Sequence, residues 1–345
     1  MPRLSNENGS GGNRRRARGV RATLADVASA AAVSTASASR ALTRPEAVSE
    51  ELRTRVTGAA DLLGYVANSA ARALARRESG CVGVIVGDLE EPGVAPALGA
   101  LDERLAAAGW ALLLRAGGEA ATTLKSAAAL LGRGVEGLVF VGVATPPGLA
   151  ALRGIERLPC VSVDRGDETG FVGGTGLDRA RAGQLIADYL LQLGHRRLAV
   201  VAGAASAVGA LVAEAVRAER AGRGFELEVL SLNEAFAPDR IAAWPRLQNA
   251  PTALICGSDA VASAMMQACM NLGIGVPRQM SIVGFGDTPL ARCVSPKLSS
   301  LRIPATAAGI AAAEHLLARF AGDTPDRTEC SAKLVVRGST GHVFS

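Results

Sequence analysis

Short apolar runs of strand length alternate with longer amphipathic stretches over most of the chain, from residue 81 to residue 337. Helical patterns separate the apolar runs, which are CVGVIV (81–86), ALLLRA (111–116), GLVFVGV (137–143), CVSVD (160–164), LAVVAG (198–203), ALIC (253–256), MSIVGF (280–285) and KLVVR (333–337). Strictly alternating strands and helices predict parallel sheets covered by helices on both faces. About 260 residues of this pattern predict two such subdomains with a ligand cleft between them.

The segment before this alternation has a helical period instead. Residues 23–66 predict three short helices, each beginning at a residue whose side chain caps helices well: Thr23, which forms a capping box with Asp26, then Ser34 and Ser49. A break at 31–33 separates the first two helices, and Gly64 ends the third. The sequence therefore predicts a compact all-α module ahead of the α/β region.

Composition and charge refine this division. Residues 1–80 hold 13 Arg, no Lys and 7 acidic residues, whereas the rest of the chain is nearly neutral. Such a distribution is typical of a polyanion-binding head on a neutral body. Because five of these arginines lie in 14–21, a soluble protein with an idle basic tail remains the alternative. Residues 1–22 have almost nothing apolar to bury, and we expect a disordered basic arm.

Targeting and redox signals are weak. Arg14-Arg15-Arg16 is followed by no apolar stretch, which argues against a secretory or twin-arginine signal, and no apolar run is long enough to span a bilayer. The six cysteines are scattered without a C-x-x-C pair, and we expect reduced thiols, no metal and no membrane association. A cytoplasmic protein is the simplest expectation.

The first two helices carry the candidate chemistry. A short positioning helix, a tight turn and a second helix that begins with small hydroxylated residues suit the DNA major groove, which is about 12 Å wide. We expect Arg40 to reach a guanine edge, Ala36 to touch a thymine methyl group, and Ser34, Ser37 and Ser39 to bond phosphates. From spacing alone, an ordinary Ala-rich helical bundle explains the same pattern.

The residues of this segment resemble the head of the LacI/GalR family of bacterial transcription regulators. The similarity continues through Leu63-Gly64-Tyr65-Val66-Ala67-Asn68 and Ala71-Arg72-Ala73-Leu74, and returns at Leu193 to Arg197, Pro277 to Asp287 and Leu298 to Arg302. The resemblance covers residues 23–340. It implies a helix-turn-helix head plus an α/β core of the periplasmic-binding-protein type, with two Rossmann-like parallel-sheet subdomains.

The resemblance also assigns boundaries. It implies the basic arm at 1–22, the DNA-binding domain at 23–66, a hinge helix and linker at 67–79, and the effector-binding and dimerisation domain at 80–340. Within that domain the expected N-subdomain is 80–178 plus 304–322, and the expected C-subdomain is 179–303 plus 323–340.

Its implications for DNA binding are specific. Thr35, Ala36 and Arg40 match base-reading positions, and Leu74 matches a leucine that wedges into the minor groove at the operator centre. The full set of expected DNA-contacting residues is Thr23, Leu24, Ser34, Thr35, Ala36, Ser37, Ser39, Arg40, Ser49, Tyr65, Asn68, Ala71 and Leu74. A homodimer on a pseudo-palindromic operator, acting as a repressor, is implied. Ala32 and Thr43 depart from the family pattern; if the turn needs a positive φ at residue 32, Ala costs about 1 kcal/mol.

The expected effector site departs further. Asp164, Asp259 and Asp287 match family positions that bind effector, yet each also suits capping or turn bonding at a strand end. Ser206 to Ala210 lacks the usual clamping arginine, and the segment from Asp88 to Gly93 lacks an aromatic. We therefore expect no ordinary neutral hexose, but a sugar acid, a phosphate ester or another metabolite, or else a site that has lost its ligand.

Enzyme signatures are poor. Gly174-Thr175-Gly176 precedes a helix, but Arg179 stands where a dinucleotide site needs its third glycine. His195 sits in a predicted helix-to-strand turn and suits a structural role. We expect no enzyme and no cofactor. A solute-binding protein or an enzyme on the same α/β scaffold is the alternative, although it leaves the helical head unexplained.

Overall fold

The computed structural model describes residues 22–66, 79–163, 173–202, 214, 216–218 and 224–343. The chain divides into two compact units, Met1–Arg77 and Glu78–Ser345. The predicted hinge residues Asn68, Ala71 and Leu74, and the candidate Asp164, lie outside the described residues. Both the all-α head and the two-sheet α/β core predicted from sequence are confirmed.

The head contains the three predicted helices, α1 (Leu24–Ala30), α2 (Thr35–Thr43) and α3 (Glu50–Leu62), with a short 3-10 turn at Pro45–Ala47. Each helix begins as its cap predicts: Thr23 and Asp26 form a capping box, and Ser34 and Ser49 accept from the backbone N–H three residues on. Small apolar side chains form the core of the head, and these are Val27, Ala28, Ala31, Ala38, Ala41, Val56, Ala59 and Ala60. Alanines allow the three short helices to pack closely.

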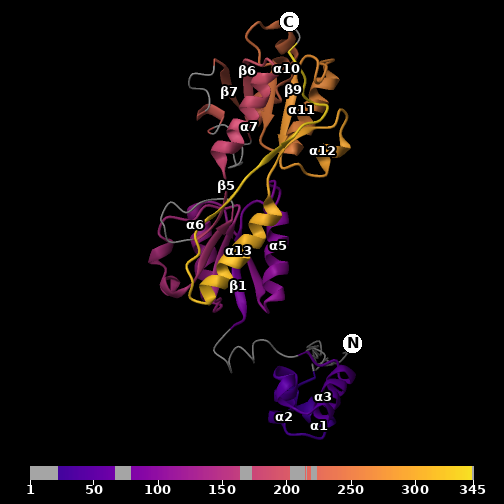
Figure 1. Ribbon diagram of the computed structural model, residues 1–345, viewed down its shortest axis with the longest axis vertical. Coiled ribbons are helices and arrows are strands. Elements are labelled where there is room, and N and C mark those ends of the chain that lie inside the picture. Colours follow the sequence, from indigo (N-terminus) through magenta and orange to yellow (C-terminus); the bar gives the residue numbers. More distant parts are fainter. Residues whose placement is uncertain are drawn as a thin grey trace, which may run out of the picture. The chain divides into compact units, whose positions relative to one another are not determined.

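The first α/β subdomain is a six-stranded sheet in the order β11-β5-β4-β3-β1-β2. Its strands are β1 (Cys81–Val86), β2 (Ala111–Ala116), β3 (Gly137–Val141), β4 (Cys160–Val163), β5 (Gly173–Leu177) and β11 (Thr328–Cys330). All described pairings in it are parallel. The helices α5 (Val94–Ala107) and α13 (Ala305–Phe320) pack together on one face, and α6 (Ala120–Leu131) covers the other (Figure 1).

The second subdomain has the order β12-β10-β9-β8-β6-β7. Its strands are β6 (Arg197–Ala202), β7 (Glu226–Ser231), β8 (Ala253–Cys256), β9 (Ser281–Phe285), β10 (Ser299–Arg302) and β12 (Lys333–Val335). All described pairings are parallel except that of β12 with β10, which is antiparallel. α7 (Arg179–Gln192) packs on one face, and α9 (Leu232–Ala235), α10 (Pro238–Ala243) and α11 (Asp259–Asn271) on the other. The remaining short helix, α12 (Leu290–Cys293), follows β9.

Three segments of the described chain connect the two subdomains, and the third differs from the predicted boundary. The first lies at Asp178, between β5 and α7, and the second at Ile303–Pro304, between β10 and α13. The third was expected at residue 323, but β11 pairs with β5, so the chain returns only between Cys330 and Lys333. The hydrophilic Thr-Glu-Cys strand gives no apolar signal, because it pairs at the sheet edge with its side chains largely exposed.

Four strands escape the apolar pattern: β11, described above, and β5, β7 and β10. β5 contains the Gly174-Thr175-Gly176 segment considered above for a dinucleotide site. It is extended strand, and the buried Thr175 hydroxyl donates to the Ala308 carbonyl. β7 is an edge strand, and most of its side chains are exposed to solvent. β10 has the sequence SSLR, and its buried serines form hydrogen bonds with other side chains. β3 ends at Val141 rather than 143, since Gly142 adopts φ +63°.

Candidate DNA-binding helix and ligand cavity

Helix α2 turns one side toward the head core and presents the other to solvent. Ala38 and Ala41 are buried, whereas Thr35, Ala36 and Arg40 are exposed. All three predicted base-reading residues therefore share the free face of one helix. Because their backbone is fixed by the Ser34 cap and by packing, their side chains are presented on a rigid support.

The hydroxyl groups at the start of α2 are partly engaged within the head. The Ser34 hydroxyl accepts from the Ser37 amide at 3.1 Å, and the two serine hydroxyls lie 2.9 Å apart. Ser39 is half-buried, and its carbonyl accepts from the Thr43 hydroxyl at 2.8 Å. Ser34 remains exposed, so its cap role does not prevent an outward hydrogen bond.

The other predicted contact residues occupy the ends of α1 and α3. Thr23 is exposed at the start of α1, and the carboxylate of Asp26 accepts from its amide at 2.7 Å. These hydrogen bonds hold the pKa of Asp26 below its usual value. Leu24 and Tyr65 are half-buried against the head core, and Ser49 is exposed at the start of α3.

The turn between α1 and α2 has the positive φ at residue 32 on which the predicted cost of alanine depends. Ala32 adopts φ +52°, in the left-handed region where a side chain is disfavoured. The Val33 amide donates to the Ala28 carbonyl at 2.9 Å, so this turn also closes the C-terminus of α1. Arg44, directly after α2, is an exposed cation that the sequence argument did not single out. In the sequence, only the excess of basic residues in the first 80 positions indicated such a cation.

The two described aspartates of the expected effector site are engaged by the protein itself. Asp259, at the start of α11, is 1% exposed and accepts from the Ser300 hydroxyl at 2.6 Å and the Thr288 amide at 2.6 Å. Burial raises the pKa of its carboxyl, although these hydrogen bonds oppose that shift. Gly284 is required beneath it, because a Cβ there would lie 2.3 Å from the Asp259 carboxylate oxygen.

Asp287 lies within a cluster of arginines that sequence reasoning did not find. Its side chain is fully buried and accepts from Arg302 at 2.7 Å and Arg337 at 2.5 Å, with Arg292 at 3.7 Å. Burial disfavours the charge of this carboxylate, but hydrogen bonds and charge from Arg337 and Arg302 outweigh it and keep the pKa below its usual value. The effector role of Asp259 and Asp287 stays a prediction, and their contacts are those of residues that fix local structure.

His195 also has a structural environment, as its position in a turn predicts. It is 2% exposed, with Nδ1 2.9 Å from the Thr252 hydroxyl and Nε2 3.0 Å from that of Ser281. Burial is the main cause that lowers its pKa. All six cysteines are free, and among the described residues there is no group of three or more His, Cys, Asp or Glu side chains placed to hold a metal ion.

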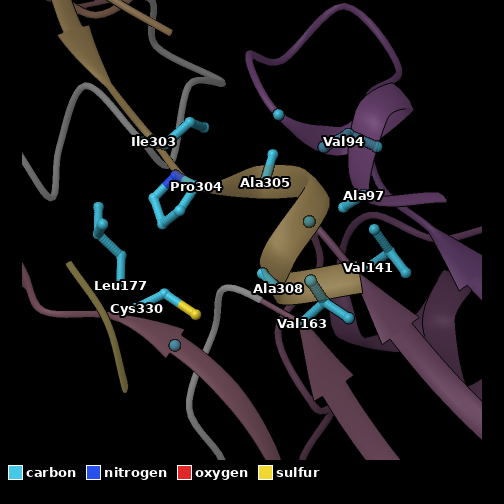
Figure 2. A pocket seen from close by; sticks show the side chains of 13 residues that line it. Val94, Ala97, Val141, Val163, Leu177, Ile303, Pro304, Ala305, Ala308 and Cys330 are labelled. Carbon is cyan, nitrogen blue, oxygen red and sulfur yellow. The ribbon is translucent and has the colours of Figure 1, made fainter. Parts of the chain in front are cut away.

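A cavity lies at the carboxyl ends of the first sheet, beneath two of the crossings between subdomains (Figure 2). It contains about 370 Å³ of empty space, including its open mouth. Its walls come from the first turns of α5 and α13, the ends of β3, β4 and β5, and the crossing segments, with Val94, Val141, Val163, Leu177, Ile303 and Cys330 among the lining residues. Six separate stretches of the chain contribute to this wall, so no local sequence motif indicates it.

The geometry defines the class: a helix-turn-helix DNA-binding head joined to a two-subdomain α/β ligand-binding core. Residues 23–68 match the domain described as bacterial regulatory proteins of the lacI family, and residues 187–340 match a periplasmic binding protein-like domain. The chain is 33% identical to the HTH-type transcriptional regulator GntR of Pseudomonas aeruginosa, covering 88% of this chain and 90% of that protein. It is 31% identical to MalR of Streptomyces coelicolor, covering 92% and 96%.

This chain belongs to the LacI family and is a DNA-binding transcription regulator. Solved structures share its fold. The lac repressor dimer bound to operator and the anti-inducer ONPF has a TM-score of 0.81 at 23% identity, covering 93% of this chain and 99% of that one. The regulator CelR in complex with cellobiose has a TM-score of 0.65 at 24% identity, covering 92% and 100%. In the part of the chain that the structure describes, none of the helices has the length and apolar character needed to cross a membrane.

Proposed function

We propose that this protein is a repressor that binds a pseudo-palindromic operator as a homodimer and responds to a small molecule in its α/β core. The observation that carries the proposal is the exposed face of α2, where Thr35, Ala36 and Arg40 stand free while Ala38 and Ala41 anchor the helix. A helix so presented fits the major groove with its N-terminal side chains at base edges.

Each part of the DNA contact has a proposed role. Arg40 reads a guanine through a bidentate hydrogen bond, and Ala36 contacts a thymine methyl group. Ser34, Ser49 and Thr23 bond phosphates, which position the head without reading sequence. The resemblance of residues 68–76 to a hinge helix adds Leu74 as a minor-groove wedge, which kinks the duplex and enlarges the contact surface.

The same proposal includes a homodimer, a small-molecule effector and a cytoplasmic location for the protein. The lac repressor structure is a dimer on operator, and CelR was solved with cellobiose, so both properties have precedent in proteins of this fold. A chain that acts on chromosomal DNA works in the cytoplasm, at the nucleoid. The relatives named above are transcription regulators, which supports a regulatory rather than an enzymatic role.

Selection of binding sites from random DNA by the full-length protein tests the proposal. We expect a two-fold related consensus, retention of that sequence over unrelated DNA, and a steep loss of affinity as salt rises, because phosphate contacts release counterions. Sedimentation of the complex should give two chains per operator. Equal retention of unrelated sequences at every salt concentration would show that the head does not read bases.

A further inference from the structure

The second subdomain contains another cavity, at the edge of its sheet where the parallel strands begin. Among the residues that line it, Arg197 begins β6, Thr252 directly precedes β8, and Met280 directly precedes β9. The chain leaves this sheet for the first subdomain at Ile303, from the opposite edge, because β10 runs parallel to β9 and ends there. We call this space the distal cavity. None of the segments that connect the two subdomains is among its described lining residues.

The distal cavity is large enough for a small molecule. Its volume is about 340 Å³, within the range of about 300–1,000 Å³ that is typical of small-molecule pockets. A single ring that carries one charged group suits a space at the lower end of this range. Val343 lines the cavity, and Phe344 and Ser345, which follow it, lie outside the described residues. A chain that ends at Val343 is therefore one of the test variants.

One part of the cavity wall is apolar. Trp244, Ile274 and Met280 line the cavity and are almost completely buried. Leu247 and Val343 also line it, and both are large apolar side chains that remain exposed to water. A ligand that covered them would remove this apolar surface from water, which favours binding. An indole in the wall also favours a flat ring as a stacking partner.

The polar part of the wall is cationic. Arg197, Arg278 and His342 line the cavity, and its described lining residues include no aspartate or glutamate. Nε of the half-buried Arg197 donates to the Ala250 carbonyl at 2.9 Å, and its two terminal nitrogens form no hydrogen bond with a described residue. Arg278 is exposed and forms no hydrogen bond or ion pair with a described residue. Two guanidinium groups are thus available to an anion.

A neutral donor adds to these charges. The side-chain oxygen of Gln279 accepts from the Gly275 amide at 2.8 Å, so the side-chain nitrogen of Gln279 stays available to a ligand. Guanidinium groups bind carboxylate and phosphate groups through paired N–H donors, and an anchored guanidinium loses little freedom when it does so. An anion near Arg197 and Arg278 with a ring near Trp244 would use both parts of the wall.

We propose that the distal cavity binds a small organic anion, in which a carboxylate or phosphate group is attached to a single flat ring. The arginines bind the anionic group, and the apolar wall takes the ring. This is a second ligand site, separate from the effector site expected between the subdomains. It does not rest on the proposed function, because binding to it is measured without DNA.

Calorimetric titration of the full-length protein tests the ligand class. Benzoate and phenyl phosphate are the ring-bearing anions. Benzamide and benzylamine keep the ring without negative charge, whereas acetate and inorganic phosphate keep the charge without a ring. We expect at least one ring-bearing anion to bind about tenfold or more tightly than each of these four controls. Its affinity should fall as salt rises, because salt screens the exposed arginine charge.

A matched pair of arginine variants places this binding in the distal cavity. Arg278→Gln removes a lining charge and should weaken the ring-bearing anion by about tenfold. Arg246 is also exposed and lies between two lining residues, Pro245 and Leu247, but does not line the cavity itself. Arg246→Gln should change the affinity by less than about twofold. Both changes are at the surface, so both variants should fold.

Tryptophan fluorescence gives a second measure of where the anion binds. The chain has two tryptophans, and only Trp244 lines the distal cavity. In Trp110→Phe the remaining emission comes from Trp244, and we expect it to change with the same affinity that calorimetry gives. Calorimetry of the arginine pair decides the question if Trp110→Phe fails to fold.

The chain that ends at Val343 tests whether the last two residues compete for the cavity. We expect it to bind the ring-bearing anion with the affinity of the full-length protein. Binding by the shortened chain alone would show that the chain's own end occupies the space, and would overturn the proposal. The proposal is also overturned if neither ring-bearing anion binds, if benzamide binds as tightly as benzoate, if both arginine variants lose affinity equally, or if the Trp244 emission stays unchanged on binding.

Discussion

Gly309 of α13 lies directly against the backbone of Ala97 on α5: a Cβ atom on Gly309 would stand 2.2 Å from the Ala97 carbonyl oxygen. The two helices therefore cross with no side chain between them. Ala97 and the next inward residue of α13, Ala308, both line the cavity, so this contact fixes one of its walls. The crossing joins a helix from the first part of the chain to one more than 200 residues later.

Replacing Gly309 by alanine should separate the helices. We expect Gly309→Ala to lower the free energy of unfolding by about 1–3 kcal/mol, because overpacking forces the backbones apart. Urea denaturation followed by the fluorescence of Trp110, which stacks on Phe320 at the end of α13, measures it. The control is Gly99→Ala on the exposed side of α5, where nothing lies within 4 Å and alanine should stabilise by about 0.5–1 kcal/mol. Equal effects at both positions would contradict the close contact.

The strained turn of the head predicts a stabilising change. Ala32→Gly removes the cost of a side chain at φ +52° and should stabilise the head by about 1 kcal/mol. Hydrogen exchange of the buried Val27 and Ala28 amides in the full chain measures this locally. Ala30→Gly, at the last residue of α1, should instead lower the stability of the head, by up to about 1 kcal/mol. If amide exchange is not slower in Ala32→Gly than in the wild type, the turn carries no strain.

Arg40 should read sequence rather than only supply charge. We expect Arg40→Ala to cost about 1–3 kcal/mol on the selected operator and to relax the preference at one base position. Arg53→Ala removes an exposed arginine of α3 that lies 3.7 Å from Glu50. It should weaken binding to all DNA sequences equally, and by less than Arg40→Ala weakens binding to the operator. Anisotropy titration with a set of single-base operator variants separates these effects. A uniform loss for Arg40→Ala would reassign it to phosphate binding.

Leu74 lies outside the described residues, and its wedge role stays a prediction from the family resemblance. If it unstacks the central base step, Leu74→Ala should reduce the bend of the bound operator, which fluorescence energy transfer between the DNA ends reports. Leu62→Ala, at an apolar side chain of the head that is 89% exposed, should leave the bend unchanged. An unaltered bend in Leu74→Ala would exclude the wedge.

The buried His195 predicts acid sensitivity. Burial holds its pKa below the usual value, so as pH falls through about 6.5 the unfolded chain binds a proton that the folded chain resists. Its contribution to stability is present above that pH and is lost as pH falls toward the lowered folded pKa. We expect His195→Gln to be less stable at pH 7 but to lose less between pH 7 and 5 than the wild type does.

The charge of the exposed His342 adds to the lowering of the His195 pKa, so His342→Gln should reduce the pH dependence of stability only slightly, and by less than His195→Gln does. His315 also has a pKa lowered by burial, so part of the acid sensitivity should remain in every variant. Denaturation at several pH values gives the difference between the wild type and His195→Gln. A difference that does not change with pH would contradict a buried neutral ring.

The sequence by itself determined the head and most of the sheet strands. Helix caps such as Thr23 and Ser34 act on backbone groups three residues away, and a strand such as β1 is buried on both faces and is apolar throughout. Local chemistry therefore decides where these elements begin and end. The free face of α2 follows from the same period, because a helix that buries Ala38 and Ala41 must present Arg40 on its other side.

Only the tertiary structure decided how the ligand cavity is built and what surrounds the candidate aspartates. The strand at Thr328–Cys330 exists because β5 offers it an edge, and the wall of the cavity combines residues as distant as Val94 and Cys330. The sequence did not indicate the arginine partners of Asp287, because they lie 5, 15 and 50 residues away along the chain. Long-range packing sets the polarity of a cleft, and so the composition of the cavity wall could not be seen before the chain was folded.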